Sequence, residues 1–225
     1  MPPQPLPARP PQRIAVLGAE STGKTQLAGD LAAALQESGR STALVPEVLR
    51  EWCDREGRTP RPDEQTAIAQ EQARRVLALD AVDFVIADTT PLMTALYSHL
   101  LFNDQSLYDF ALAHQRIYAV TLVTGLDLPW MADGLQRDGP HVREPVDTLL
   151  RGALSRSGVT WQVIYGHGPA RLDNALNAIY SIANNDLMTL GKGQKTLKSA
   201  AWSWSCEKCS DPGCEHRLFT DLLKS

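Results

Sequence analysis

Short apolar runs alternate with longer amphipathic stretches along most of the chain. A short apolar run bounded by turn residues predicts a buried strand, whereas apolar residues at helical spacing predict a helix with one buried face. In the first such helix, Leu27, Leu31 and Leu35 recur at every fourth position. Strands are predicted at residues 14–17, 41–45, 84–87, 118–124 and 160–165. Helices are predicted at residues 24–35, 63–80, 91–101, 104–114, 145–157 and 170–183.

This alternation predicts the fold class. Parallel strands are joined by crossover connections, usually helices, which cover both faces of the sheet. We therefore expect an α/β domain with a parallel sheet covered by helices on both faces, over residues 13–184. Residues 1–12 are rich in proline and predict a disordered arm. Residues 185–225 differ in composition and are expected to form a short tail rich in Cys and His.

The loop after the first predicted strand carries the clearest chemical pattern. Residues 18–25 match the phosphate-loop pattern G-x-x-x-x-G-K-[ST]. The two glycines let the backbone curl so that successive N–H groups point at one phosphate, and the following helix adds partial positive charge. Lys24 is expected to reach the β- and γ-phosphates of ATP, and the Thr25 hydroxyl to ligate Mg²⁺. The fold class is thus a P-loop NTPase, with nucleotide-binding residues Gly18, Ala19, Glu20, Ser21, Thr22, Gly23, Lys24 and Thr25.

An acidic residue ends the third predicted strand. Residues 84–87 read Phe-Val-Ile-Ala, and Asp88 follows. An apolar strand that ends in a carboxylate is the Walker B pattern, in which the acid holds Mg²⁺ or its water. Strands also end in aspartate where the side chain only caps a turn, and the pattern alone leaves both readings open.

The segment after the second predicted strand is a candidate substrate site, because ligands of open α/β sheets bind beyond the carboxyl ends of the strands. Glu47 is our first candidate for ribose binding or general base, and Asp88 is its competitor. Arg50 could bind substrate, or it could belong to a solvated helix face. Trp52 could stack on a nicotinamide ring, or it could simply pack against the protein.

Composition narrows the function classes. The 225 residues carry a net charge of −4, which gives no reason to expect nucleic-acid binding. No apolar run approaches the ~20 residues of a membrane span. The N-terminus lacks the apolar core of a signal peptide. We therefore expect a cytoplasmic protein that binds neither nucleic acid nor membranes.

The tail contains a possible metal site. Three thiols and one imidazole lie within eleven residues, and such a set can bind structural Zn²⁺ tetrahedrally. The spacing at the end of the cluster is tighter than in common zinc fingers, so free reduced cysteines are the alternative. The tail could also be a docking surface for a protein partner. The candidate ligands are Cys206, Cys209, Cys214 and His216.

Taken together, the loop at 18–25, Pro46-Glu47-x-x-Arg50-Glu51, Ala87-Asp88-Thr89 and the run 128–137 resemble the ribosylnicotinamide kinase domain of NadR-type NAD-salvage proteins. The resemblance covers residues 13–181 and implies transfer of the ATP γ-phosphate to the 5′-hydroxyl of nicotinamide riboside. It implies a catalytic role for Arg137, which lies in a Gly- and Pro-rich stretch at 128–143 that is typical of a mobile lid. It also implies that Gly166 and Arg171 contribute to adenine binding.

Two functions are compatible with these features. The first is an ATP- and Mg²⁺-dependent kinase for nicotinamide riboside or a similar nucleoside. The second is an ATP-binding regulatory protein, or ATPase, that uses the domain as a nucleotide-dependent switch and its zinc-stabilised tail to contact a partner. A kinase should have an open, ribose-sized pocket beside Glu47, Asp88 and the lid, whereas a switch should have that space filled.

Overall fold

The chain is represented by a computed structural model that describes residues 10–131 and 140–187, with side chains up to residue 181. The chain divides into two units, Met1–Asn185 and Asp186–Ser225. The described elements belong almost entirely to the first unit. The predicted arm and tail lie mostly outside the described residues, so their boundaries stay predictions.

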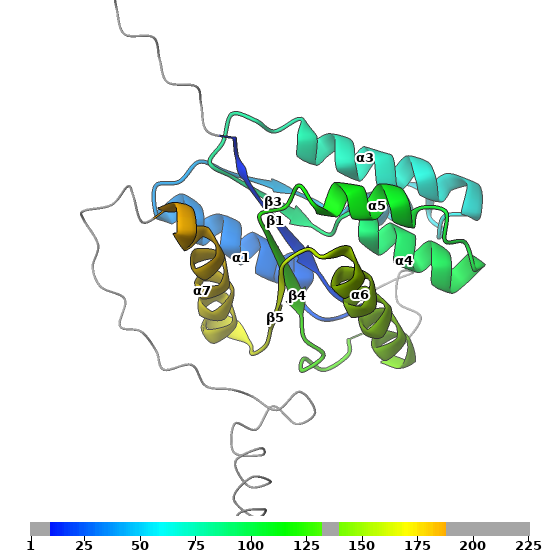
Figure 1. The fold of residues 1–225 in the computed structure, drawn as a ribbon. Helices are drawn as coiled ribbons and strands as arrows, with labels where there is room; N and C mark the ends of the chain where they lie inside the picture. Colours follow the sequence, from blue (N-terminus) through cyan, green and yellow to red (C-terminus); the bar gives the residue numbers. More distant parts are fainter. Residues whose placement is uncertain (1–9, 132–139, 188–225) are drawn as a thin grey trace, which may run out of the picture. The chain divides into compact units, whose positions relative to one another are not determined.

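Five strands in the described part form one sheet in the order β2-β3-β1-β4-β5, and every neighbouring pair is parallel (Figure 1). The strands are β1 (Gln12–Leu17), β2 (Thr42–Val45), β3 (Phe84–Asp88), β4 (Val120–Thr124) and β5 (Trp161–Ile164). The α-helices are α1 (Lys24–Glu37), α2 (Val48–Glu56), α3 (Gln65–Leu77), α4 (Pro91–Phe102), α5 (Tyr108–Gln115), α6 (Arg143–Ser157) and α7 (Gly168–Leu187). Short 3₁₀ turns lie at Pro62–Glu64 and Pro140–Val142. The predicted fold class, a parallel α/β P-loop domain, is confirmed.

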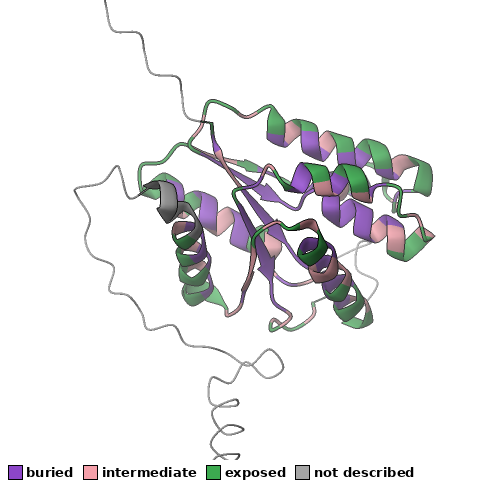
Figure 2. Ribbon diagram, viewed as in Figure 1, coloured by how far each residue is buried: buried purple, intermediate pink, exposed green. Residues whose placement is uncertain are grey.

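Each face of the sheet has its own apolar core. Helices α1 and α7 cover one face, where leucines of α1 pack on Ile14, Val16 and Ile86 (Figure 1). Helices α3, α4, α5 and α6 contribute to the core on the other face, against Ala15, Leu17 and neighbouring strand residues. Figure 2 shows the central strands almost wholly buried and the outer surfaces of the helices exposed. This double cover explains why the strands read as continuous apolar runs.

The helix boundaries differ from the predicted ones where local side chains favour a turn. The helix expected at 104–114 begins only at Tyr108, because the Asp104 carboxylate accepts a hydrogen bond from the Ser106 amide, 2.9 Å away, and stabilises a turn. The helix expected at 63–80 begins with the 3₁₀ turn and ends at Leu77. No helix within the described residues is long and apolar enough to cross a membrane.

The topology brings the chemical motifs to one edge of the sheet. Because all strands are parallel, the loops that follow β1, β2 and β3 emerge at the same edge. Strands β3 and β4 lie on opposite sides of β1, so the chain changes direction across the sheet next to the loop after β1. Ligands of open α/β sheets bind in the crevice at such a switch point.

Candidate active site

The loop between β1 and α1 adopts a curled backbone. Gly18, Ser21 and Gly23 have positive φ angles of 150°, 54° and 71°. A Cβ at position 18 would overlap the Thr124 hydroxyl, so only glycine fits there. Left-handed residues interspersed with right-handed ones turn successive N–H groups toward one point and form an anion-binding nest. The loop therefore has the backbone that its sequence predicts.

Side chains from other elements fix this loop. The Thr22 hydroxyl donates to the Ala19 carbonyl at 2.7 Å and lies 2.6 Å from the Thr124 hydroxyl at the end of β4. The Met131 amide donates to the Ser21 hydroxyl at 2.7 Å. These contacts anchor the loop to the central sheet and to the segment that follows β4.

Replacing Gly18 with alanine is expected to lower the free energy of unfolding by about 1–3 kcal/mol, the usual cost of a strained non-glycine backbone, with a further cost for displacing Thr124. Gly29→Ala is the matched control. Gly29 lies inside α1, where an added Cβ meets no atom within 4 Å. Alanine there should raise stability by about 0.5–1 kcal/mol. Urea denaturation of both variants measures the difference, and equal midpoints would contradict the packing argument.

The residues proposed for Mg²⁺ lie together. The Thr25 hydroxyl donates a hydrogen bond to Asp88, whose side chain is buried. Burial raises the pKa of Asp88, while Thr25 and Lys24 act in the opposite direction. The other carboxylate oxygen, Oδ1, is buried and has no hydrogen-bond partner within the described residues. An exposed hydroxyl beside a buried carboxylate that has one oxygen without a partner in the described part of the chain fits Mg²⁺, which prefers oxygen ligands and keeps several waters.

Opposite charges surround the loop lysine. The Lys24 amino group donates to the Ala19 carbonyl at 2.8 Å. Burial lowers the pKa of Lys24, whereas the carboxylates of Glu47 and Asp88 raise it. Burial raises the pKa of Glu47, and Lys24 opposes that shift. Without a bound polyphosphate, the lysine charge is thus balanced by acids that would otherwise repel each other.

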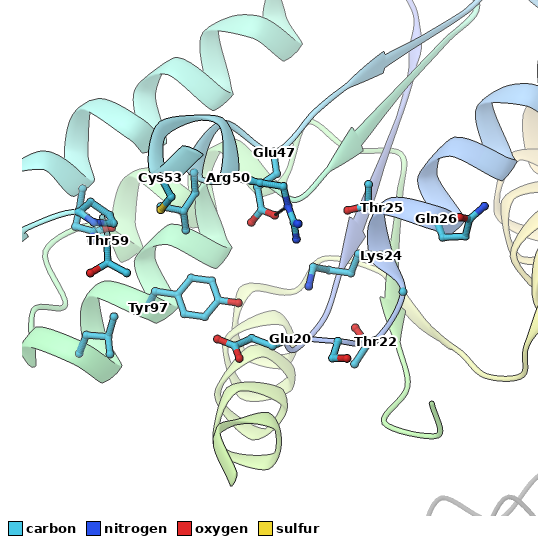
Figure 3. A pocket seen from close by; sticks show the side chains of 16 residues that line it. Glu20, Thr22, Lys24, Thr25, Gln26, Glu47, Arg50, Cys53, Thr59 and Tyr97 are labelled. Carbon is cyan, nitrogen blue, oxygen red and sulfur yellow. Dashed lines mark ion pairs between the residues drawn. The ribbon is translucent and has the colours of Figure 1, made fainter. Parts of the chain in front are cut away.

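A cavity of about 370 Å³ opens beside this charged cluster. Figure 3 shows Lys24, Glu47 and Tyr97 pointing into it from the start of α1, the segment between β2 and α2, and α4. Arg50 lies beside Glu47, and its Nε is 3.6 Å from a Glu47 carboxylate oxygen. The other lining residues are Glu20, Ser21, Thr22, Gly23, Thr25, Gln26, Leu49, Cys53, Thr59, Pro60, Gln65 and Leu101. The cavity therefore joins the phosphate loop to a more apolar space between α2, α3 and α4.

Trp52 does not line this cavity. Its ring is half-buried on α2, and the Arg58 guanidinium lies over it, 4.7 Å from the ring centre. The structure thus agrees with the packing alternative rather than with substrate stacking. Within the described residues, the aromatic side chain that lines the cavity is Tyr97.

Gly166 and Arg171 do not line the cavity, and Arg171 contacts the phosphate loop. Arg171, on α7, is buried and donates to the carbonyls of Thr22 at 2.6 Å and Gly166 at 3.3 Å. Burial lowers the pKa of Arg171, and Asp127 opposes that shift. The structure therefore gives Arg171 a direct role in holding the loop, and its contribution to adenine binding stays a prediction.

Some predicted residues fall outside the described part of the chain. They are Arg137 in the lid and the zinc candidates Cys206, Cys209, Cys214 and His216. Residues 10–131 and 140–187 contain no cluster of three or more His, Cys, Asp or Glu that could hold a metal ion. The zinc site and the role of Arg137 stay predictions.

The apolar side chains that line the cavity were not predicted from the sequence. Tyr97 and Leu101 belong to a helix that is apolar nearly all round, so its pattern does not indicate which side faces a ligand. Gln65 did carry a signal. It shares the buried face of α3 with Ile68, Gln72 and Val76, where an amide is out of place unless it is hydrogen-bonded.

Comparisons with solved structures agree with this architecture. A NadR protein in complex with NAD and AMP-PNP aligns with a TM-score of 0.62 and 16% identity, covering 83% of this chain and 52% of that one. A NadR protein in complex with NR aligns with a TM-score of 0.63 and 18% identity, covering 77% and 52%. The chain thus spans about half the length of these NadR proteins.

A deoxyadenosine kinase from M. mycoides, with products dCMP and a flexible dCDP bound, is similar along its whole length. It aligns with a TM-score of 0.54 and 12% identity over 76% of this chain. At such identities the likeness establishes the fold alone. No curated protein sequence matches the chain. A family model described as an AAA domain matches residues 13–171, which is more than half of the chain, and the chain therefore belongs to this AAA domain family of P-loop proteins.

Proposed function

We propose that the protein is a Mg²⁺-dependent kinase that transfers the γ-phosphate of ATP to the 5′-hydroxyl of a nucleoside, with nicotinamide riboside as the acceptor. The open cavity between the phosphate loop and Glu47 carries this proposal. Its volume of about 370 Å³ lies within the usual range of small-ligand sites. A nucleotide-dependent switch, the rival function, would be expected to have this space filled by side chains.

The positions of Asp88 and Glu47 support a different role for each of these two acids. Asp88 is hydrogen-bonded to Thr25 and does not line the cavity, which supports a role in holding Mg²⁺. Glu47 lines the cavity beside Lys24, which supports contact with the acceptor hydroxyl. Thr25 and Asp88 would hold Mg²⁺, which would supply positive charge to offset the negative charge that develops on the transferring phosphate.

In the proposed reaction, the protein acts mainly by positioning the polyphosphate and the acceptor hydroxyl next to each other. The loop amides and Lys24 hold the polyphosphate, and Glu47 orients the acceptor hydroxyl and accepts its proton. A bond forms between the acceptor oxygen and the γ-phosphorus as the bond to the β-phosphate oxygen breaks. The products are ADP and a nucleoside 5′-phosphate. A catalytic role for Arg137 remains part of the proposal, as predicted from the sequence, whereas the zinc-stabilised tail belongs to the rival switch function.

The proposal is also supported by the neighbouring folds. One NadR structure contains NR, another contains NAD and AMP-PNP, and the deoxyadenosine kinase contains dCMP and dCDP. All of them are similar in fold to this chain.

The direct test is phosphate transfer from γ-labelled ATP, with Mg²⁺, to a panel of nucleosides that includes nicotinamide riboside. We expect label in nicotinamide riboside 5′-phosphate, and none when Mg²⁺ is removed with EDTA. Transfer to a different nucleoside would keep the kinase and change the acceptor. ATP binding or hydrolysis without any labelled nucleoside would contradict the proposal and favour the switch.

A further inference from the structure

The far end of the cavity has walls suited to a flat ring. Leu49 and Cys53 come from α2, Pro60 from the following loop, and Leu101 from α4. Burial raises the pKa of the Cys53 thiol to about 11, so that side chain is uncharged and adds to the apolar wall. The charged groups Lys24, Glu47 and Arg50 lie toward the phosphate loop. An acceptor with its hydroxyl at Glu47 would place its ring at the apolar end.

Gln65 lines the same cavity and carries a polar atom that has no partner within the described residues. Gln65, the first residue of α3, lines the cavity although only 1% of its surface is exposed. Its carbonyl oxygen, Oε1, is buried and has no hydrogen-bond partner within the described residues. Buried side-chain amides are normally satisfied, because leaving one unpaired costs folding free energy.

Gln72 shows how the same helix treats a structural glutamine. It lies two turns further along the buried face, and its Oε1 accepts a hydrogen bond from the Val48 amide at 2.8 Å. This bond fixes the start of α2. Gln72 does not line the cavity. The amide nitrogen of Gln72 also has no hydrogen-bond partner within the described residues, so the two glutamines differ in their carbonyl oxygens and in whether they line the cavity. The unpaired carbonyl of Gln65 is therefore available to a molecule that enters the cavity.

We propose that Gln65 determines acceptor specificity by hydrogen-bonding to the edge of the acceptor ring, and that this ring carries a carboxamide or an equivalent edge with both a donor and an acceptor. A glutamine side chain offers one carbonyl acceptor and an NH₂ donor, and a carboxamide is its complement. The inference rests on the proposed function, since it assigns the ring end of the same acceptor site.

The test compares nicotinamide riboside with pyridine riboside, which has the same charged ring and ribose but no carboxamide. Equilibrium binding of each is measured by calorimetry for the full chain and for Gln65→Leu. The unaltered chain should bind nicotinamide riboside about tenfold to a hundredfold more tightly, the usual range for one good buried polar contact. Gln65→Leu should abolish this preference and leave binding of pyridine riboside within about twofold.

Gln70→Leu is the matched control. Gln70 lies exposed on the same helix, and the substitution again replaces a glutamine with a leucine. It should leave the preference intact, and thermal unfolding of both variants checks that α3 is still folded. Gln65→Glu keeps a carbonyl oxygen and should retain more of the preference than Gln65→Leu. A general loss of packing would weaken binding of both ribosides equally.

Binding and phosphate transfer separate the two proposals. Discrimination that depends on Gln65 would support its role even if no phosphate were transferred, in which case only the proposed kinase function would fail. Transfer to nicotinamide riboside with equal discrimination in Gln65→Leu would overturn the role of Gln65 alone. Failure of the unaltered chain to bind either riboside, or equal binding of both, would also overturn it.

Discussion

Replacing Lys24 with alanine is expected to reduce phosphate transfer by about a thousandfold, comparable to the loss of a preorganised charged donor in other active sites. Lys24 is the one lysine between residues 13 and 187, so no neighbouring ammonium group can take its place. Its side chain already points into the cavity and lies among the acids (Figure 3). The initial rate of transfer from γ-labelled ATP measures the effect.

Two further variants make this result specific. Lys24→Met keeps most of the side-chain length and should be as inactive as Lys24→Ala, because the charge and not the bulk is needed. Arg40→Ala removes a positive charge from an exposed position after the same helix and should leave the rate within about twofold. A Lys24→Met enzyme with more than a tenth of the normal rate would exclude the assigned role.

Replacing Glu47 with glutamine is expected to lower kcat by about a hundredfold to ten-thousandfold, the usual contribution of a positioned general base. The substitution keeps the size of the side chain and removes its ability to accept a proton. ATP affinity should change little, because Glu47 lies on the acceptor side of Lys24. Steady-state kinetics with separate titrations of ATP and nucleoside measure both quantities.

Glu51→Gln is the control for this experiment. Glu51 lies on the same helix as Arg50, is exposed, and pairs with Arg75 at 2.6 Å outside the cavity. Its loss should leave kcat within about twofold, as expected for a surface ion pair. If Glu47→Gln retained full activity and Asp88→Asn lost the proton-transfer step alone, the assignments of the two acids would be reversed.

The pH dependence of the phosphate-transfer activity is expected to follow from the titration of Glu47. A general base acts when deprotonated, so activity is lost as pH falls through the pKa of Glu47. Burial raises this pKa above the ordinary value of 4.5. We therefore expect the acid limb of kcat/KM to lie above pH 4.5, and to be absent in Glu47→Gln. An acid limb that was unchanged in this variant would assign the titration to another group.

The residue pattern within short segments of the sequence was enough to predict the phosphate loop and the parallel sheet. The phosphate loop, its lysine and threonine, and the apolar strands that flank it depend on neighbouring residues: glycine permits positive φ, and a doubly covered parallel strand must be apolar. The loop at 18–25 and the parallel sheet were therefore predicted correctly. The start of α5 was predicted four residues early, since a single turn at Asp104 overrides a helical pattern.

The tertiary structure decided which side chains share the cavity beside the phosphate loop. Gln65, Tyr97 and Glu47 come from three separate elements, and only the order of strands and the packing of α2, α3 and α4 bring them together. Trp52, which is five residues from Glu47, turns instead toward Arg58. The sequence by itself thus determined the phosphate-loop backbone and the parallel sheet that carries it. The fold decided which side chains line the cavity next to the phosphate loop, because these side chains are brought together by contacts between residues far apart in the sequence.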